Sequence, residues 1–474
     1  MSYQVPQHID NNKIFIVNRS EIEGRLDPHF NKPFYAKLWH LLSHQNYKLV
    51  KLKDLSIALF SGITPKSGGD AYAATGAVPF VRSGDYSETN EIDFSQLLHI
   101  KEEIHQGLMH SSQLKKGDLL IAIVGATIGK IGVFQYDVDA NINQAICAVR
   151  LKDNISPYYV QAFYQTSIGQ NIIERIKRPV ARANINIEEI GNLPIPLLDS
   201  NTQSEIVRIL EEGRIQKKKK DLEAKLLLDS IDTYLLNELG IIMPGIKTDL
   251  ASRMFLVNRS NLMDRLDPKF NKDFSYIKKL SSIYSWVTLN DIVLNNGQYG
   301  ANESAIDYKI GDVRYIRITD IDDLGYLKTT DKRTISNIDK AYYLKHNDVL
   351  FARSGSVGKC YIHKDTSEQA IFAGYLIRFN LNSDKIDPDY LFYYCNSKLY
   401  YLWVNTIQRP AVQANINAQE FRTMRIPLPP LEKQKQIANH ILKIRLQAKA
   451  LQEEGNNFLE QAKKEVEHKI IECR

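Results

Sequence analysis

The segment GATIGK, from Gly125 to Lys130, comes nearest to a known ligand-binding signature, because glycines before a lysine are typical of phosphate-binding loops. Such a loop needs four residues between its glycines and a Ser or Thr after the lysine, so that backbone amides cradle the phosphates and the hydroxyl reaches a magnesium ion. Here three residues separate the glycines, and Ile131 follows the lysine. A second segment, GSVGKC, has only two residues between its glycines. Both segments therefore predict glycine-bearing turns between strands, not a nucleotide site.

Acid–base and nucleophilic chemistry lack a matching set of residues. Asp27 and Asp267 each lie in an RLDP sequence, but a single carboxylate beside an arginine is typical of a structural ion pair or a turn. The histidines do not recur with the surrounding sequence, since Lys269 is the counterpart of His29. No His-Glu-x-x-His, Gly-x-Ser-x-Gly or Asp/Asn-Pro-Pro-Tyr sequence occurs. We therefore expect a non-catalytic protein without a metal site.

Composition limits the class of protein. The 474 residues are 43% hydrophobic and 24% charged, which indicates a globular protein of two or three domains. The net charge of +6 is compatible with a polyanionic partner but is shared by many ordinary proteins. No long apolar run or signal-peptide pattern occurs, so we expect a cytoplasmic location. The cysteines are too scattered for a disulfide framework or a zinc site: Cys147, Cys360, Cys395 and Cys473.

The segments that are expected to position the polar residues occur twice in the chain. RPVARANINIEEIGNLPIPL begins at Arg178, and RPAVQANINAQEFRTMRIPL begins 231 residues later, at Arg409. Further pairs keep the same order: IFIVNRSEIEGRLDPHFNK with MFLVNRSNLMDRLDPKFNK, VPFVRSGDY with VRYIRITDI, and GDLLIAIVGATIGK with NDVLFARSGSVGK. Such a repeat is far longer than the roughly 20 to 50 residues of a solenoid unit. It indicates the tandem duplication of a whole domain and the segment that follows it.

Each copy is predicted to begin as an α+β domain. VPFVR, DLLIAIV and QAICAVRL are short apolar or alternating runs bounded by Gly, Asp and Asn, which predicts strands. PYYVQAFYQTSIGQNIIERI has apolar residues at three- and four-residue steps with only Gly169 as a breaker, which predicts one helix. Loops rich in Gly, Ser, Lys and Arg connect these elements.

A long amphipathic helix is predicted after each domain. In the second copy the apolar positions fall at steps of four and three, with Gly455 in one slot of the seam: Ile437, Ile441, Ile444, Ala448, Leu451, Phe458 and Ala462. The first copy keeps the register but is interrupted at Lys217 and Lys220: Ile206, Leu210, Ala224, Leu227 and Ile231. Each helix either packs on its own domain or pairs with the other as an antiparallel coiled coil. We favour the pairing, because so long a helix needs a surface to lie against.

In their order and duplication, these segments are similar to the DNA-specificity subunit of type I restriction–modification systems. The resemblance covers both copies, from about Ile14 to the C-terminus. It rests on VRSGD and IRITDI, on the two segments that end in Gly-Lys, and on ANINAQEFRTMRIPLPPLEKQKQIA. The first copy departs from the family pattern at PIPLLDSNTQSEIV, which lacks the double proline and the Glu-Gln of the helix start. The start of that helix is therefore left open.

The resemblance implies an α+β fold, with two similar target recognition domains separated by a long antiparallel two-helix coiled coil in a pseudo-twofold internal repeat. The recognition domains would be residues 1–200 and 241–430, the latter with a preceding linker, and the spacer helices 201–240 and 431–474. The subunit would be non-catalytic and would bind double-stranded DNA. It would dock two adenine-N6 methyltransferase subunits and the restriction/translocase subunits. S-adenosylmethionine, ATP and Mg²⁺ would belong to those partners.

Two similar DNA-binding domains joined by a stiff spacer are suited to a DNA target that consists of two half-sites. Half-sites on one face of B-DNA lie about 34–36 Å apart per helical turn. A helix pair of roughly 55 Å can accommodate that separation. Because the loops differ between the copies, we expect two different half-sites, which make a bipartite and asymmetric target.

Candidate DNA-binding residues follow from the chemistry of base and phosphate contacts. Arg and Lys suit guanine, Asn and Gln suit adenine, and Lys, Arg, Ser and Thr suit phosphates. In the first copy the candidates are Lys66, Arg82, Lys130, Arg178 and Arg182. In the second copy they are Gln298, Tyr299, Arg317, Arg353, Lys359, Arg409 and Gln413.

Comparison of the copies ranks these candidates. Arg82 and Arg317 occur in both, so a role in the scaffold or at the phosphates competes equally with base reading. Tyr299 is expected to pack more than to stack. Arg182 and Gln413 occupy one position that differs, which favours specificity.

Two further polar groups are expected to be structural. The recurring asparagines would fix the backbone by local hydrogen bonds: Asn184, Asn186, Asn415 and Asn417. The run KKKK, from Lys217 to Lys220, is typical of a solvated helix face, with phosphate tracking or an acidic partner as alternatives.

Other functions remain open at this point. The recognition subunit of a type IIB enzyme shares the design and differs mainly in its partner. A protein-binding scaffold with two α+β domains belongs to another class, and an enzyme of unknown type is third. Binding to a bipartite DNA that requires a methyltransferase would exclude the scaffold.

Overall fold

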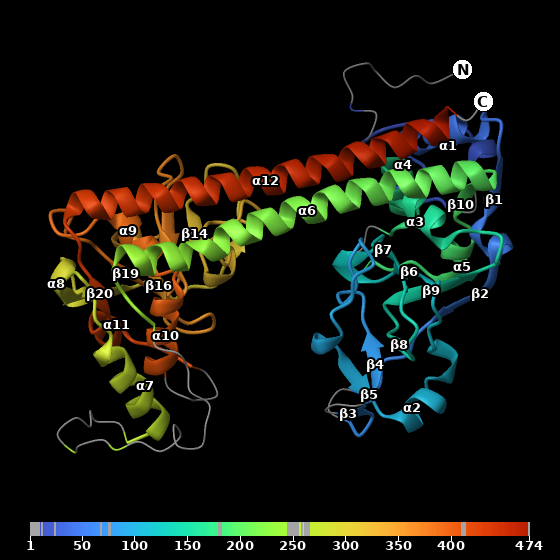
Figure 1. Cartoon of the computed structure of the whole chain (residues 1–474). Helices are drawn as coiled ribbons and strands as arrows, with labels where there is room; N and C mark the ends of the chain where they lie inside the picture. The colour runs from blue at the N-terminus through green and yellow to red at the C-terminus, as the bar shows by residue number, and fades with distance from the viewer. Residues whose placement is uncertain are drawn as a thin grey trace. The chain divides into compact units, whose positions relative to one another are not determined.

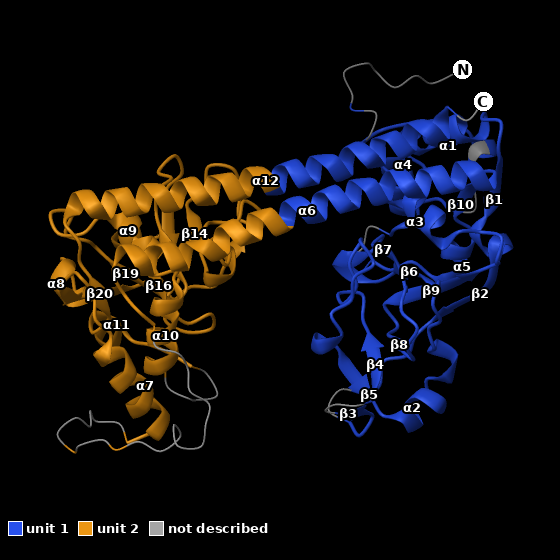
Figure 2. Ribbon diagram, in the orientation of Figure 1, with its two compact units in different colours: residues 1–221, 452–474 blue, residues 222–451 orange. Residues whose placement is uncertain are grey.

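The computed structural model describes residues 10, 13–22, 25–66, 69–73, 77–178, 183–243, 256, 259, 266–408 and 414–472 (Figure 1). The chain forms two compact units (Figure 2). Unit 1 comprises residues 1–221 and 452–474, and unit 2 comprises residues 222–451. Each unit has its own hydrophobic core. Among the described residues, no helix has both the length and the apolar character needed to cross a membrane.

Unit 1 is built around an antiparallel sheet in the order β2 (Ser56–Ser61), β9 (Ile146–Leu151), β6 (Leu119–Ala122) and β7 (Ile131–Val133). A second sheet has the order β3 (Tyr72–Ala73), β5 (Leu98–Ile100), β4 (Val78–Val81) and β8 (Asn141–Ile142), with β4 and β8 parallel. A separate pair joins β1 (Lys48–Lys51) to β10 (Pro194–Leu197). The shorter helices are α1 (Pro33–Ser43), α2 (Glu102–Gln106), α3 (Pro157–Gln165), α4 (Ser167–Ile176) and α5 (Ile187–Gly191).

Unit 2 repeats this plan. Its main sheet has the order β12 (Gln298–Tyr299), β19 (Leu376–Phe379), β16 (Val349–Ala352) and β17 (Cys360–Ile362). The other pairs are β14 (Arg314–Ile316) parallel to β18 (Ala370–Phe372), β13 (Ile306–Asp307) with β15 (Arg333–Thr334), and β11 (Trp286–Thr288) with β20 (Arg425–Pro427). The shorter helices are α7 (Pro268–Lys279), α8 (Leu289–Ile292), α9 (Pro388–Tyr394), α10 (Lys398–Ile407) and α11 (Ala418–Arg422). The predicted α+β repeat is confirmed.

The same tyrosine contact fastens the sheet to a helix in both units. The Tyr159 hydroxyl donates to the Pro196 carbonyl at 2.6 Å, and the Tyr390 hydroxyl donates to the Pro427 carbonyl at 2.6 Å. Both tyrosines are almost completely buried. Because burial of an unpaired hydroxyl would be costly, each contact fixes how its helix sits against the last strand of the domain.

The single helix predicted over PYYVQAFYQTSIGQNIIERI is wrong, because the segment forms two helices, α3 and α4. Thr166 has an extended backbone between them, and its side chain accepts from the Gly169 amide. A Cβ on Gly169 would lie 2.3 Å from the Phe163 carbonyl oxygen, so glycine allows α4 to pack closely on α3. In unit 2, Ser397 caps α10 in the same way.

The two long helices pair antiparallel in each unit. They are α6 (Ser200–Glu238) and α12 (Leu431–Ile471), which lie side by side (Figure 1). In unit 1, Glu205 pairs with Lys469 at 2.5 Å, and Lys217 donates to Asn456 at 2.6 Å. In unit 2, the ring of Tyr234 lies 4.1 Å from that of His440, and Glu238 pairs with Lys433. Numbers rise along one helix as they fall along the other, so the predicted antiparallel coiled coil is confirmed.

The predicted seam residues are buried or partly buried, and six of them pack in the cores of the units: Ile206, Leu210 and Ala462 in unit 1, and Ile231, Ile437 and Ile441 in unit 2. Seven are buried: Ile206, Leu210, Ala224, Ile437, Ile441, Ala448 and Ala462. Five are partly buried: Leu227, Ile231, Ile444, Leu451 and Phe458. The two irregularities of the seam meet each other in unit 1, since a Cβ on Gly455 would lie 3.2 Å from Lys220 Cβ and 3.3 Å from the Lys217 carbonyl oxygen. Gly455 therefore leaves room for the bulkier α6 residues opposite it.

Helix α6 begins at Ser200 without the double proline of α12. The Asp199 carboxylate accepts from the amides of Asn201 and Thr202 at 3.0 and 3.1 Å, which satisfies amide groups at the start of the helix. Gln203 and Gln434 then make one contact in both repeats, each donating to a carbonyl five residues earlier at 2.9 and 2.8 Å. Asp199 thus substitutes for the missing sequence of the helix start.

Candidate nucleic-acid interface

The arginine shared by the two repeats closes a tight turn after an equivalent strand. Arg82 follows β4, and its Nε and Nη2 donate to the Asp85 carboxylate at 2.9 and 3.0 Å. Arg317 follows β14 and donates to Asp320 in the same way, with Nε at 3.1 Å and Nη2 at 2.6 Å. These hydrogen bonds raise the pKa of both arginines above the ordinary value. Each guanidinium is therefore engaged within its own unit.

The lysine that ends each glycine-rich segment ties a hairpin to the same turn. Lys130 donates to the Ser83 carbonyl at 3.2 Å and lies 4.7 Å from the centre of the Tyr86 ring. Lys359 donates to the Ile321 carbonyl at 3.0 Å and to Asp323 at 3.1 Å. Burial lowers the pKa of Lys130.

The glycine-rich segments are turns between strands, as predicted. Each follows the central strand of a main sheet and precedes the edge strand: β6 and β7 in unit 1, β16 and β17 in unit 2. The glycines adopt positive φ values, which are strained for other residues: Gly125, Gly129, Gly355 and Gly358.

The repeated ANIN sequence builds a capping box at the start of a short helix. The Asn186 side chain accepts from the Glu189 amide at 2.7 Å, and Glu189 accepts from the Asn186 amide at 3.0 Å. Asn417 and Glu420 repeat this exchange at 2.8 and 2.9 Å. Asn184 and Asn415 form isolated backbone bridges with Val124 and Ser354. The predicted local hydrogen bonding of Asn186 and Asn417 is confirmed.

Of the remaining candidates in loops, the structure describes Arg178 and Lys66. Arg178 donates to Glu189 at 2.8 Å, with 42% of its side chain exposed. Lys66 is exposed in the loop between β2 and β3. Arg182, Arg409 and Gln413 lie outside the described residues, so their predicted roles stand as predictions.

Two candidates of unit 2 lie on β12. The Gln298 side chain accepts from Arg378 and donates to the Ala341 carbonyl at 3.1 Å, so it organises the scaffold. Tyr299 is 39% exposed, and its hydroxyl accepts from the Ala418 amide at 3.2 Å. A polar hollow of about 630 Å³ opens beside Tyr299, lined by side chains that include Asn290, Asn417 and Gln419. Amide groups of this kind can donate and accept hydrogen bonds.

Arg353 differs from the other arginine candidates that the structure describes. Its guanidinium carbon lies 5.0 Å from the centre of the Tyr299 ring. Its Nε is buried without a hydrogen-bond partner among the described residues. Arg82, Arg178 and Arg317 all pair with a carboxylate.

Sequence reasoning missed two arginines on the long helices. Arg214 on α6 donates to the Glu88 carbonyl at 3.0 Å and to Gln165 at 2.9 Å. Arg445 on α12 donates to the Leu324 carbonyl at 2.9 Å and lies over the rings of Tyr326, Phe392 and Tyr393. Both are buried. Arg214 and Arg445 lie 231 residues apart, which is also the spacing between the two segments that contain ANIN. An arginine at the same position of both long helices was the signal available in the sequence.

The KKKK run is largely engaged within unit 1. Lys217 pairs with Asp221 at 3.0 Å, Lys218 with Glu91 at 2.7 Å, and Lys220 with Glu454 at 3.0 Å. Lys218 and Lys219 are exposed. The predicted solvated helix face therefore describes Lys218 and Lys219, whereas Lys217 and Lys220 contact α12.

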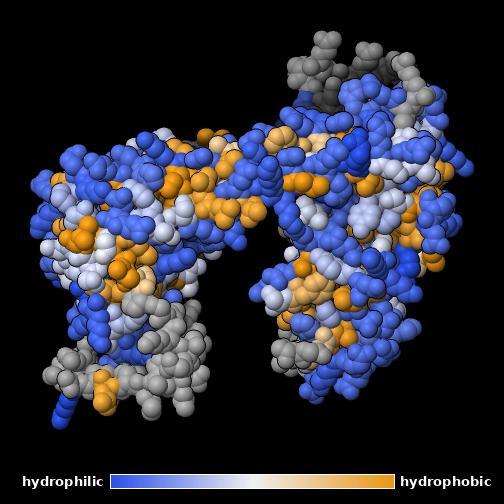
Figure 3. Space-filling view, viewed as in Figure 1, coloured by the Kyte–Doolittle hydropathy of each residue, from blue (hydrophilic) through white to orange (hydrophobic). Residues whose placement is uncertain are grey.

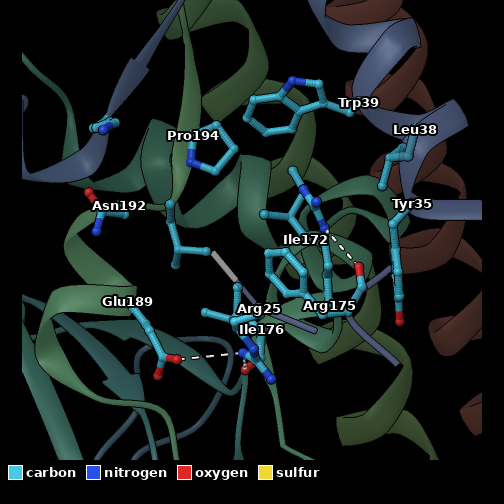
Figure 4. Close-up of a pocket in the computed structure, with 13 residues that line it drawn as sticks. Arg25, Tyr35, Leu38, Trp39, Ile172, Arg175, Ile176, Glu189, Asn192 and Pro194 are labelled. Atoms are coloured by element: carbon cyan, nitrogen blue, oxygen red, sulfur yellow. Dashed lines mark hydrogen bonds and ion pairs between the residues drawn. The ribbon is translucent and has the colours of Figure 1, made fainter. Parts of the chain in front are cut away.

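Unit 1 contains a cavity of about 450 Å³ (Figure 4). It is lined by Arg25 of the RLDP segment and by residues from the rest of the domain. Arg25 and Arg175 flank the Phe30 ring, with guanidinium carbons 4.8 and 4.2 Å from its centre. Arg25 also pairs with Asp27 at 2.9 Å and with Glu189 at 3.5 Å. None of the candidate DNA-binding residues lines this cavity. Asp27 is thus part of a structural ion pair.

Apolar side chains reach the surface of the helix pair in unit 2. Leu222 and Leu226 on α6 are 57% and 62% exposed, and Leu442 and Leu446 on α12 are 39% and 57% exposed. Figure 3 shows hydrophobic residues on this part of the surface. Exposed apolar groups are typical of a surface that binds another protein where they form one contiguous patch.

Residues 44–226 and 284–461 match the family described as "Type I restriction modification DNA specificity domain". The EcoBI specificity subunit of Escherichia coli is 26% identical over 44% of this chain and 44% of its own length. The putative MjaX specificity subunit of Methanocaldococcus jannaschii is 33% identical over 32% of this chain and 36% of its own length. The chain thus spans less than half of these two curated relatives. The StySPI specificity subunit of Salmonella potsdam is 21% identical over 85% of this chain and 82% of its own length.

The chain is also similar to solved structures. One is described as "Structural basis underlying complex assembly and conformational transition of the type I R-M system". It has a TM-score of 0.48 at 17% identity, over 90% of this chain and 97% of its own. The crystal structure of a type I restriction-modification S subunit from M. genitalium has a TM-score of 0.39 at 12% identity, over 90% of this chain and 96% of its own.

Proposed function

The chain belongs to the family of type I restriction modification DNA specificity domains, and from that premise we propose that it reads a bipartite, asymmetric DNA target for a restriction–modification complex. The observation that carries the proposal is that the family's domain occurs twice, at residues 44–226 and 284–461. Each occurrence is built on a four-stranded sheet of equivalent order. Two domains of one design with different surface residues suit two different half-sites.

The long helices supply a spacer of suitable length. Helices of 39 and 41 residues are each roughly 60 Å long at 1.5 Å per residue. Half-sites on one face of B-DNA recur about every 34–36 Å. A rigid antiparallel pair favours a fixed gap between the half-sites, since an antiparallel coiled coil resists bending more than a flexible linker does.

The subunit itself is proposed to be non-catalytic. Two adenine-N6 methyltransferase subunits and the restriction/translocase subunits would dock on it and supply the chemistry. S-adenosylmethionine, ATP and Mg²⁺ would bind to those partners. Support for docking comes from the apolar surface on the helix pair, at Leu222, Leu226, Leu442 and Leu446. A type IIB recognition subunit shares this architecture, and the presence of a separate translocase would distinguish the two systems.

Mapping of N6-methyladenine in a host that expresses the full chain with its methyltransferase tests the proposal. The expected result is one motif in two unlike parts, with an invariant gap. As a control, the methyltransferase expressed alone should leave that motif unmodified. A continuous motif, or modification that does not depend on this chain, would contradict the proposed function.

A further inference from the structure

The main sheets of the two units end in the same backbone arrangement but carry different side chains. In unit 1, the Ile123 amide donates to the Ala145 carbonyl at 2.9 Å, and the Ile185 amide donates to the Ile123 carbonyl at 2.9 Å. In unit 2, Arg353 takes the place of Ile123 in both bonds, with Tyr375 and Ile416 as its partners, again at 2.9 Å. Arg353 is therefore the counterpart of Ile123, and Tyr375 the counterpart of Ala145.

The first strand of each sheet supplies a third such position. Ser61 lies opposite Cys147 in the β2–β9 pair, and Tyr299 lies opposite Ile377 in the β12–β19 pair. The next residue is a glycine in both units. A Cβ on Gly62 or Gly300 would lie 1.7 or 2.2 Å from a carbonyl oxygen of the second sheet, so the two strands are equivalent. Tyr299 is therefore the counterpart of Ser61.

These three positions share one face of the sheet in unit 2. Residues directly opposite in an antiparallel pair point to the same face, and residues two apart along a strand do so as well. Tyr299 and Phe351 both lie opposite Ile377, and Arg353 and Tyr375 lie two residues further along their strands. Unit 1 thus has Ile, Ala and Ser where unit 2 has Arg and two Tyr.

The surroundings of the Arg353 guanidinium are compatible with binding of an external ligand. Its guanidinium lies over the Tyr299 ring at 5.0 Å. The Tyr299 hydroxyl is held by the Ala418 amide at 3.2 Å, which fixes the ring. The Arg353 Nε is buried and has no hydrogen-bond partner in the part of the chain that the structure describes. The Arg353 guanidinium thus lies on an aromatic ring, whereas the Arg317 guanidinium donates to the carboxylates of Asp320 and Asp331.

We propose that Arg353, supported by the Tyr299 ring, reads a guanine in the half-site bound by unit 2. The inference rests on the proposed function and assigns one base contact within it. Two guanidinium nitrogens can donate to O6 and N7 of guanine in the major groove. Stacking on an aromatic ring restricts the plane of the guanidinium, which a planar two-point contact requires.

A phosphate contact fits these observations less well. Phosphates occur at every nucleotide, so a residue that binds them serves any reader and has no reason to be confined to one domain. Arg353 occurs in unit 2 alone, where Ile123 is its apolar counterpart in unit 1. The two tyrosines that accompany it are likewise specific to unit 2. Differences between the repeats are expected where the bases are read.

The test uses the full chain with its methyltransferase and the map of N6-methyladenine. Arg353→Ile introduces the side chain that unit 1 has at this position, so the strand can accept it. The expected result is that one guanine of one half-site becomes unselective. Preference for that base should fall about 5- to 150-fold, as for the loss of one two-point base contact. The other half-site and the gap should be unchanged.

Arg333→Ala is the matched control for charge. Arg333 belongs to unit 2 but gives its donors to Asp331 and Asp307. The variant removes the same charge and should leave the motif unchanged. If Arg353→Ile keeps the wild-type motif, or weakens modification equally at every sequence, the assignment to guanine is wrong. If the wild-type complex itself shows no bipartite motif, the proposed function fails, and the inference fails with it.

Two further variants separate base reading from loss of folding. Arg353→Lys retains the charge and much of the bulk but not the planar fork, and it should weaken the preference for the same base. Tyr299→Ser introduces the side chain of unit 1 and removes the support for Arg353, so it should affect that base and no other. Tyr299 is a positioning residue in this scheme. A change at a different base with Tyr299→Ser would contradict the proposed support.

Discussion

Arg317 and Arg353 are both arginines near the end of a strand in unit 2, yet their surroundings differ. Arg317 donates to the carboxylates of Asp320 and Asp331, whereas Arg353 lies on an aromatic ring. A guanidinium bound to two carboxylates must release them before it can bind a base, which costs free energy. The partners of a cation therefore decide its role more than its type does. By this criterion Arg82 and Arg317 belong to the turns, and Arg353 is available to a ligand.

The pair of Arg317 and Asp320 is expected to stabilise unit 2. Asp320→Asn should lower the free energy of unfolding by about 1.5–3 kcal/mol, because it weakens charged hydrogen bonds to a carboxylate that is only 4% exposed. Thermal melting of the purified chain measures the change. Asp307→Asn is the control, since that carboxylate is 90% exposed and its ion pair should contribute little. Equal melting temperatures for the two variants would contradict a structural role of the Arg317 turn.

At this scale the sequence predicts residue types but not their partners. Arg82 and Arg317 were identified as shared between the copies, and sharing alone left a role in the scaffold or at the phosphates as open as base reading. Asp85 and Asp320 lie only three residues away, but a spacing of three does not reveal a turn. The contact of Arg353 with Tyr299 could not be predicted, because it joins residues 54 positions apart through strand pairing. Arg214 and Arg445 were missed because each appears as a polar position on an amphipathic helix.

The close approach of α6 and α12 depends on a few small residues. A Cβ on Gly213 would lie 2.5 Å from Ala462 Cβ, well inside van der Waals contact. Gly213→Ala should gain about 1 kcal/mol in helix propensity but lose about 1–3 kcal/mol through overpacking, so that the pair is destabilised. The double variant with Ala462→Gly should recover much of the loss, and thermal melting of the three variants measures this coupling. Gly84→Ala, which meets open space, is the control.

If Gly213→Ala melts at or above the wild-type temperature, the helices can separate locally without cost. Lack of recovery in the double variant would show that the clash is not with Ala462. Both residues belong to unit 1, so the cycle reports on the pairing of the helices within that unit.

The helices themselves were predictable, because apolar steps of three and four continue over most of their length. Their relative register was not, since a seam does not show which residue faces which. Gly455 in one helix and Lys217 with Lys220 in the other looked like unrelated interruptions, and only the structure pairs them. The break between α3 and α4 was also hidden. Thr166 and Gly169 are compatible with a continuous helix, and the packing of α4 against α3 decides otherwise.

At the scale of the whole molecule, the repeat predicts that the recognition segment of one unit can replace that of the other. In unit 1 the segment from β1 to β10 covers residues 48–197, and in unit 2 the segment from β11 to β20 covers residues 286–427. Each begins and ends in one two-stranded pair. Each also presents a loop carbonyl to an arginine of a long helix, Glu88 to Arg214 and Leu324 to Arg445. The contacts that hold a segment to the helices are thus of the same kind in both units.

A chain that carries residues 286–427 in both places should therefore read the same half-site twice. On the proposed function, the antiparallel order of α6 and α12 predicts that the two identical half-sites appear in inverted orientation, so that the asymmetric motif becomes a palindrome with the wild-type gap. Mapping of N6-methyladenine with the grafted chain and its methyltransferase measures this directly. The reverse graft, with residues 48–197 in both places, is the matched control and should yield a palindrome of the other half-site. A motif that stays asymmetric in both grafts would place base selection outside these segments, in the long helices or in the partner subunits.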